Sequence, residues 1–178
     1  MKRIKAKPTQ KKGFLDTKEK VIAACITGAV ILLVVFVLML LENNKGKLII
    51  NNNTDYNLDY VNSYFVMSYE DATEISLKDI DGINANKKSI TKFGEVDLRY
   101  TESNLEIVFQ FENHEELFVD SGIFNDILKG NVNITFDQTK DPDIIKMKVK
   151  AKNGILPSKT IICNDEYMIN LKDNEIME

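Results

Sequence analysis

Residues 145–152 read IKMKVKAK, and this stretch sets the expectation for the larger part of the chain. Its apolar side chains, those of Ile145, Met147, Val149 and Ala151, alternate with lysines at 146, 148, 150 and 152. Successive side chains of a β-strand point to opposite faces, so the alternation predicts a strand with one buried face and one solvated face. Strands of this kind are typical of antiparallel sheets.

The same alternation recurs along residues 47–178. Strands are predicted at 47–52, 60–69, 96–100, 105–111, 117–119, 131–136, 144–151, 160–162 and 167–171. Turn signals separate them at Asp81-Gly82, Lys129-Gly130, Asp141-Pro142 and Asn153-Gly154. About eight or nine short strands with turns between them predict an all-β domain built as an antiparallel β-sandwich.

The lysines of residues 145–152 have two interpretations. As a solvated strand face, they would keep this strand from pairing with other chains at an open edge of the sheet. Alternatively, they form a cationic patch for an acidic polymer.

Residues 21–41 have a different pattern, an apolar run that contains no charged side chain. At about 1.5 Å per residue the run forms about 31 Å of helix, which matches a bilayer core of about 30 Å. The sequence therefore predicts one transmembrane α-helix from Val21 to Leu41. Because no ionisable residue lies within it, the span does not resemble that of a channel or a transporter.

Charge is distributed unevenly on the two sides of this span. Residues 1–20 hold eight basic and two acidic side chains, whereas residues 43–178 hold 15 basic and 24 acidic ones. Basic flanks stay in the cytoplasm. We therefore expect a basic cytoplasmic arm at 1–20, a short linker at 42–46, and an extracytoplasmic domain at 47–178. The expected location is the plasma membrane, with a single pass.

The basic arm is expected to lie against anionic lipid headgroups, so the lipid bilayer is its predicted partner and nucleic acid is not. Ala24 and Gly28 are small residues four positions apart, a spacing that lets two helices approach closely and predicts a homodimer contact. The frequent lysine, asparagine and isoleucine, with few arginines, indicate a Gram-positive-like bacterium.

Two stretches near the span resemble processing signals. Residues 22–25, which end at Cys25, resemble a lipoprotein box, and residues 11–14, which end at Phe14, resemble the cleavage end of a prepilin leader. However, Cys25 precedes most of the apolar run instead of following it, and charged residues follow Phe14. The run also ends without a small-residue cleavage site, so an uncleaved signal anchor is predicted.

One motif points to catalysis. Residues 118–122, Phe-Val-Asp-Ser-Gly, resemble the active-site turn of aspartic proteases, and the strand at 105–111 resembles the approach to that turn. Retroviral-type members of that family work as homodimers. The resemblance implies that Asp120 would share a proton with its twin. The apolar-apolar-Gly element that follows in the family is missing at the expected distance.

Metal and cysteine signals are sparse. Carboxylates at loop spacing give low-ranked calcium candidates, which are Asp79, Asp81, Asp137, Asp141 and Asp143. They do not fit the EF-hand pattern, and a single histidine offers no zinc cluster. Cys163 is the one cysteine outside the span, and we expect it to be a buried apolar residue. No cofactor is predicted.

The sequence therefore favours a non-catalytic interaction or structural module of the cell envelope, anchored by one helix and binding a protein or a cell-wall polymer. A homodimeric protease that uses Asp120 is one alternative. A ligand or ion sensor is another, and its arm of 20 residues would need a membrane partner to pass a signal on.

Overall fold

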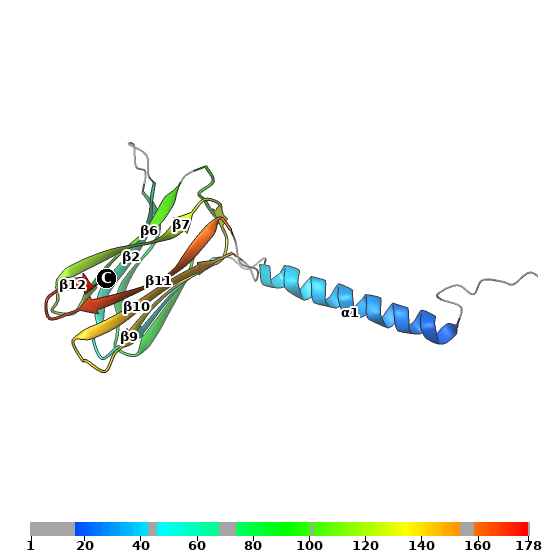
Figure 1. Ribbon diagram of the computed structural model, residues 1–178, viewed down its shortest axis with the longest axis horizontal. Coiled ribbons are helices and arrows are strands. Elements are labelled where there is room, and N and C mark those ends of the chain that lie inside the picture. Colours follow the sequence, from blue (N-terminus) through cyan, green and yellow to red (C-terminus); the bar gives the residue numbers. More distant parts are fainter. Residues whose placement is uncertain (1–16, 43–45, 68–73, 101, 154–158, 178) are drawn as a thin grey trace, which may run out of the picture. The chain divides into compact units, whose positions relative to one another are not determined.

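The computed structural model describes residues 17–42, 46–67, 74–100, 102–153 and 159–177 (Figure 1). The chain divides into two compact units, Met1–Leu40 and Leu41–Glu178, which are described one at a time.

The first unit contains helix α1, Lys18–Glu42. The Thr17 hydroxyl accepts a hydrogen bond from the N–H of Lys20 at 3.4 Å, which caps the first turn. The hydroxyl of Thr27 donates to the carbonyl of Ala23 at 2.9 Å, so the helix satisfies this polar side chain internally. Within the described ranges α1 is the one helix long and apolar enough to cross a membrane, as an anchor or as a signal sequence.

The second unit is built of strands. The described residues form β1 (Lys47–Asn53), β2 (Leu58–Met67), β3 (Ile75–Ile83), β4 (Lys87–Lys92), β5 (Val96–Asp97), β6 (Ser103–Phe111), β7 (Glu116–Phe124), β8 (Ile127–Leu128), β9 (Asn131–Gln138), β10 (Ile144–Lys152), β11 (Ile161–Asn170) and β12 (Glu175–Met177). The all-β character of the domain after the helix is confirmed.

Ten of these strands join into one continuous sheet instead of the predicted plain sandwich. The strand order is β3-β2-β6-β7-β11-β10-β9-β1-β4, with β12 beside β11 and a separate β5-β8 pair. β11 explains the difference, because its first residues pair with β7 while its other edge pairs with β10. The sheet curls into a barrel-like wall, which Figure 1 shows from the side of β6, β7, β11 and β10. Alternating residues predict two faces for each strand, but they do not show where a sheet joins itself.

The two ends of the sheet, β3 and β4, are consecutive in the chain and meet at a short turn. Near this turn the buried amide of Asn52, on β1, donates to the carbonyl of Ile83, on β3, at 3.1 Å. The sheet is antiparallel except at one place, where β1 and β9 run parallel. Parallel partners are brought together by long connections, which residue alternation does not reveal.

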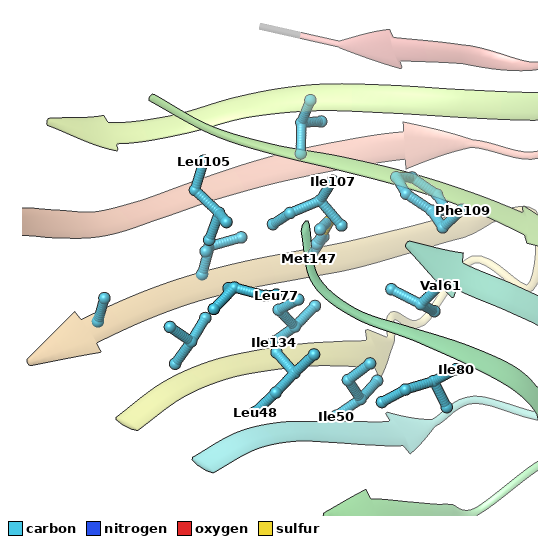
Figure 2. Packing of buried hydrophobic residues seen from close by; sticks show 14 of the residues in the cluster. Leu48, Ile50, Val61, Leu77, Ile80, Leu105, Ile107, Phe109, Ile134 and Met147 are labelled. Carbon is cyan, nitrogen blue, oxygen red and sulfur yellow. The ribbon is translucent and has the colours of Figure 1, made fainter. Parts of the chain in front are cut away.

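Alternating apolar side chains fill the interior, as predicted. Figure 2 shows several of them pointing into one cluster: Leu48, Ile50, Val61, Leu77, Ile80, Leu105, Ile107, Phe109, Ile134 and Met147. Three rings, those of Phe109, Phe111 and Phe136, contact one another with centroids 5.2 to 6.0 Å apart. Each such aromatic pair contributes about 0.5–1.5 kcal/mol beyond its buried area.

β10 carries the quoted stretch and lies between β9 and β11. The interpretation of its lysines as protection of an open edge is therefore wrong, because β10 has a partner on both sides.

β3 was not predicted, because its buried residues Leu77, Ile80 and Ile83 recur at every third position and not at every second. A bulge shifts the pairing with β2 beside Leu77, and Gly82 has φ of 59° within the strand. Both irregularities break the two-residue alternation. The predicted turn at Asp81-Gly82 is therefore wrong, because both residues belong to β3.

Candidate functional site

β7 and β11 separate after a short contact, and the gap between them is the most distinctive feature of the barrel wall. The two strands pair only at Phe124 with Ile161 and at Ile123 with Ile162. Further along, β12 takes the edge of β11 that β7 leaves free. We call residues 118–122 of β7 and 163–167 of β11 the β7–β11 seam.

Side chains replace backbone pairing across the seam. The Asp165 carboxylate accepts hydrogen bonds from the Gly122 N–H at 2.7 Å and from the Ser121 hydroxyl at 2.8 Å. The Tyr167 hydroxyl donates to the carbonyl of Asp120 at 2.6 Å. Hydrogen bonds to a charged acceptor are the stronger ones, so Asp165 holds the start of the gap together.

Gly122 allows this close approach. Its φ is 67°, a left-handed conformation that glycine adopts without steric cost. A Cβ atom at this position would lie 2.5 Å from the Cβ of Cys163 and 2.9 Å from the carbonyl oxygen of Ile162. Close packing against β11 therefore explains why the third residue of the Asp-Ser-Gly motif, Gly122, is a glycine.

Part of β7 presents an open strand edge. The Asp120 carbonyl points toward β11, and in a regular strand the N–H and C=O groups of alternate residues point to the same side. The N–H and C=O of Phe118 and the N–H of Asp120 therefore point away from β6. Within the described ranges no hydrogen bond joins these three groups to another strand.

The open edge borders a shallow apolar groove of about 420 Å³. Its lining comes from β7, β11 and β12: Phe118, Val119, Glu166, Tyr167, Ile176 and Met177. The Phe118 side chain is 61% exposed, which is unusual for so large an apolar group.

Acidic side chains surround the edge. Burial and the nearby negative charge of Glu106 raise the pKa of Asp120. Glu116 accepts a hydrogen bond from the Tyr60 hydroxyl, and this bond raises the pKa of Tyr60 to about 12. Among the described ion pairs, none involves Glu106, Glu116 or Asp120, so the charge on this edge is not neutralised.

The structure places the protease-like residues inside a strand. Asp120, Ser121 and Gly122 all belong to β7, and Ser121 faces the interior with 1% of its surface exposed. Asp120 lies on the outer face opposite Glu106. Its catalytic role stays a prediction.

The calcium candidates are spread over separate elements. Asp79 and Asp81 lie on β3, and the turn after β9 carries Asp141 and Asp143. Asp137, on β9, accepts hydrogen bonds from Lys148 at 2.6 Å and from Asn53 at 2.8 Å. Burial alone would raise its pKa, but these two hydrogen bonds and the positive charges of Lys148 and Lys146 together outweigh burial and lower it.

Within the described ranges, no three His, Cys, Asp or Glu side chains lie close enough together to hold a metal ion. Calcium binding therefore stays a prediction.

Sequence reasoning singled out residues 118–122 of the seam, although for another role, and missed Asp165 and Tyr167 on β11. Asp165 falls between two predicted strands that are one strand, β11, in the structure. Its direct neighbours, Asn164 and Glu166, are polar as well, so the local sequence resembles a turn and carries no signal of the role of Asp165. Cys163 is buried, as predicted, with its sulfur 3.7 Å from the Ser121 hydroxyl.

Comparison of the chain with protein-family models, with curated proteins and with solved structures finds no match.

Proposed function

We propose that this chain is a single-pass, membrane-anchored and non-catalytic interaction module of the cell envelope, with its β-domain outside the cytoplasm. Its partner is a protein that adds an extended segment to the open edge of β7. The main support is the combination of unpaired backbone groups at Phe118 and Asp120 with an apolar groove beside them.

An extended polypeptide fits this edge for a physical reason. Backbone hydrogen bonds to a free sheet edge provide affinity, and pockets for alternate side chains provide specificity. The groove receives one apolar side chain beside Phe118. The two flanking positions then meet Glu116 and Asp120, so the partner segment carries lysine or arginine at both.

Charge also argues against a second copy of β7 as the occupant. In an antiparallel pair centred on Phe118, Glu116 would lie directly opposite Asp120 of the other copy. Like charges placed directly opposite one another destabilise a strand pair. A basic segment avoids this repulsion and forms opposite-charge pairs at the same positions.

Synthetic peptides test the proposal on the full chain, held in nanodiscs of neutral phosphatidylcholine. The probe is a fluorescent peptide of alternating residues, in which two lysines flank a central valine on one face. One control peptide has glutamates in place of the lysines. The other carries N-methyl groups on the amides that would pair with β7, which prevents edge pairing. We expect binding of the lysine peptide only, measured by fluorescence anisotropy.

Variants of the protein locate the binding site. Phe118→Ala should weaken binding at least about tenfold, because burying a phenylalanine contributes about 1.5–3 kcal/mol and every 1.4 kcal/mol is about tenfold in affinity. The matched control is Ile90→Ala, which truncates a different large apolar side chain with a similar exposed fraction, 55%. Replacing both Glu116 and Asp120 by lysine should reverse the preference, from the lysine peptide to the glutamate peptide.

The proposal fails if the N-methylated peptide binds as well as the lysine peptide. It also fails if the charge reversal leaves the preference unchanged, or if no peptide binds.

The membrane arrangement belongs to the same proposal. A helix of the length and apolarity of α1 is suited to span a bilayer, and the basic residues that precede it favour a cytoplasmic amino terminus. Protease added to intact cells should then digest the β-domain, and full protection would exclude this orientation. A helix contact through Ala24 and Gly28 remains part of the proposal, and Gly28→Leu should abolish any crosslinked dimer that depends on it.

A further inference from the structure

A second surface of the barrel, remote from the seam in strand order, carries positive charge that no ion pair among the described residues neutralises. Its lysines lie on the outer faces of β1, β4 and β10. We call this surface the cationic face, and its lysines are Lys47, Lys88, Lys92, Lys150 and Lys152.

The strand register fixes which side chains lie next to one another. One row across the sheet contains Lys92, Lys47, Asn131 and Lys152, and the next contains Ile90, Ile49, Asn133, Lys150 and Asn164. Neither row contains a carboxylate. On β10 the other two lysines are neutralised, since Lys148 pairs with Asp137 at 2.6 Å and Lys146 pairs with Glu166. Positive charge therefore collects toward one end of the strands.

The pair formed by Lys47 and Lys92 is unfavourable in the isolated protein. The two residues are direct partners on antiparallel strands, β1 and β4. Direct partners have Cβ atoms about 5 Å apart, and like charges at this distance repel. Residues 43–178 carry 15 basic and 24 acidic side chains. The two lysines therefore lie side by side on a domain whose acidic side chains outnumber its basic ones. A negatively charged ligand that lies over both lysines removes the repulsion.

The polar side chains of β9 suggest the shape of that ligand. Asn131, Asn133 and Thr135 form a lane of hydrogen-bonding groups along β9, between the lysines of β1 and β4 and those of β10. At about 3.4 Å per residue the lane is about 14 Å long. Lys47 and Lys152 lie on the two sides of this lane, and their backbones are two strands apart, about 10 Å.

We infer that the cationic face binds a linear phosphodiester polymer whose repeating units carry hydroxyl groups. The phosphates meet the lysines on both sides of the lane, because the ammonium group of lysine binds phosphate as a point charge. The hydroxyl groups meet the amides of β9. This face and its ligand are separate from the proposed peptide edge on β7.

Poly(glycerol phosphate) is the probe, added to the full chain in neutral phosphatidylcholine nanodiscs. Binding is followed by calorimetry at 50 and at 300 mM salt. We expect binding that weakens steeply with salt, as the release of bound counterions requires. Dextran, a polymer with hydroxyl groups and no charge, should not bind.

Two lysine double variants distinguish binding at the cationic face from a general effect of the protein's net charge. Lys47→Gln with Lys92→Gln should weaken binding about tenfold, the effect of two surface ion pairs. Lys140→Gln with Lys172→Gln makes the same change of charge in turns at the other end of the strands and should leave binding within about twofold. Asn131→Ala with Asn133→Ala should weaken binding of poly(glycerol phosphate) but not of inorganic polyphosphate, which has no hydroxyl groups along its chain.

Three results would overturn the inference. The first is an absence of binding at 50 mM salt, and the second is an equal loss in both lysine double variants. The third is binding to phosphatidylglycerol vesicles that is lost in the Lys47→Gln, Lys92→Gln variant and that the polymer does not compete with, which would assign the face to a membrane surface.

Discussion

The carboxylate of Asp165 on β11 accepts a hydrogen bond from the backbone N–H of Gly122 on β7 at 2.7 Å. A side chain here takes the place of a backbone carbonyl, at the point where two neighbouring strands separate. The barrel wall therefore stays joined although β7 and β11 pair through their backbones at only two residue pairs in the described residues.

Asp165→Ala should lower the free energy of unfolding by about 1–3 kcal/mol, because it leaves the Gly122 N–H and the Ser121 hydroxyl without their acceptor. Urea unfolding followed by circular dichroism measures the change. Asp59→Ala, at an exposed position of β2, is the control and should change stability by less than about 0.5 kcal/mol. Equal effects of the two substitutions would contradict this role of Asp165.

Gly122→Ala should destabilise the domain by more than about 1 kcal/mol, because the new methyl group meets Cys163 and the backbone of Ile162 at a left-handed φ. The control is Gly94→Ala, where an added Cβ meets no atom within 4 Å. Thermal unfolding compares the two variants. A wild-type melting temperature for Gly122→Ala would show that the strands separate more easily than the structure indicates.

Asp120→Asn should change how stability depends on pH. Burial and Glu106 raise the pKa of Asp120, so its folded state binds the proton more tightly than its unfolded state does. The stability that this proton contributes is complete below about pH 4, the unfolded value, and is lost as the pH rises through the folded-state pKa. The variant lacks this loss and should gain stability relative to the native chain between pH 3 and pH 7, measured by urea unfolding.

The same variant tests the protease alternative. If Asp120 is catalytic, the native chain cleaves members of a mixed peptide library and Asp120→Asn does not. Our proposal of a non-catalytic module expects no cleavage by either chain. For the pH dependence of stability, a different outcome counts against us. If the free energies of unfolding of the two chains stay parallel between pH 3 and pH 7, Glu106 and burial do not raise the pKa of Asp120.

Cys163 should react slowly with a thiol reagent while the domain is folded. Burial raises the pKa of this thiol to about 11, so little of it is thiolate at pH 8. With Cys25→Ser removing the other thiol, labelling should be about a hundredfold faster in 8 M urea, as expected from the return of the pKa toward 9. Equal rates with and without urea would show that the interior near Ser121 is open.

Lys92→Glu should raise the free energy of unfolding by about 0.2–1 kcal/mol, because it replaces a repulsive partner of Lys47 with an attractive one. Lys88→Glu is the matched control on the same strand, since its direct partner is the uncharged Asn51. The gain should disappear in 1 M salt, where surface charges are screened. A loss of stability in Lys92→Glu would mean that Lys47 and Lys92 do not repel each other.

Residue alternation predicted much of the β-domain, and the reason is local. A strand such as β10, with Met147 and Val149 inside and lysines outside, shows its two faces in its own sequence. The apolar helix could likewise be predicted from its own residues, without any distant contact. β3 was missed because a bulge beside Leu77 and the positive φ of Gly82 break that alternation.

The closure of the sheet and the candidate sites depend on contacts between distant residues. Asp165 and Gly122 are 43 positions apart, and nothing in either neighbourhood indicates that they meet. The repulsive pair of Lys47 and Lys92 likewise became visible only through the register of β1 and β4. Sequence therefore showed which residues face outward, but not which of them are neighbours.

The parallel pair of β1 and β9 has a consequence for biosynthesis. Asn51 and Thr135, which are hydrogen-bonded neighbours in this pair, are 84 positions apart. At about 5–20 residues per second, a ribosome delivers the second strand about 4 to 17 s after the first. During that interval β1, with its apolar Leu48 and Ile50, emerges without the strand that will pair with this edge and complete the wall beside it. The nascent chain therefore needs shielding, by a chaperone or by the translocation machinery, until most of the barrel has been made.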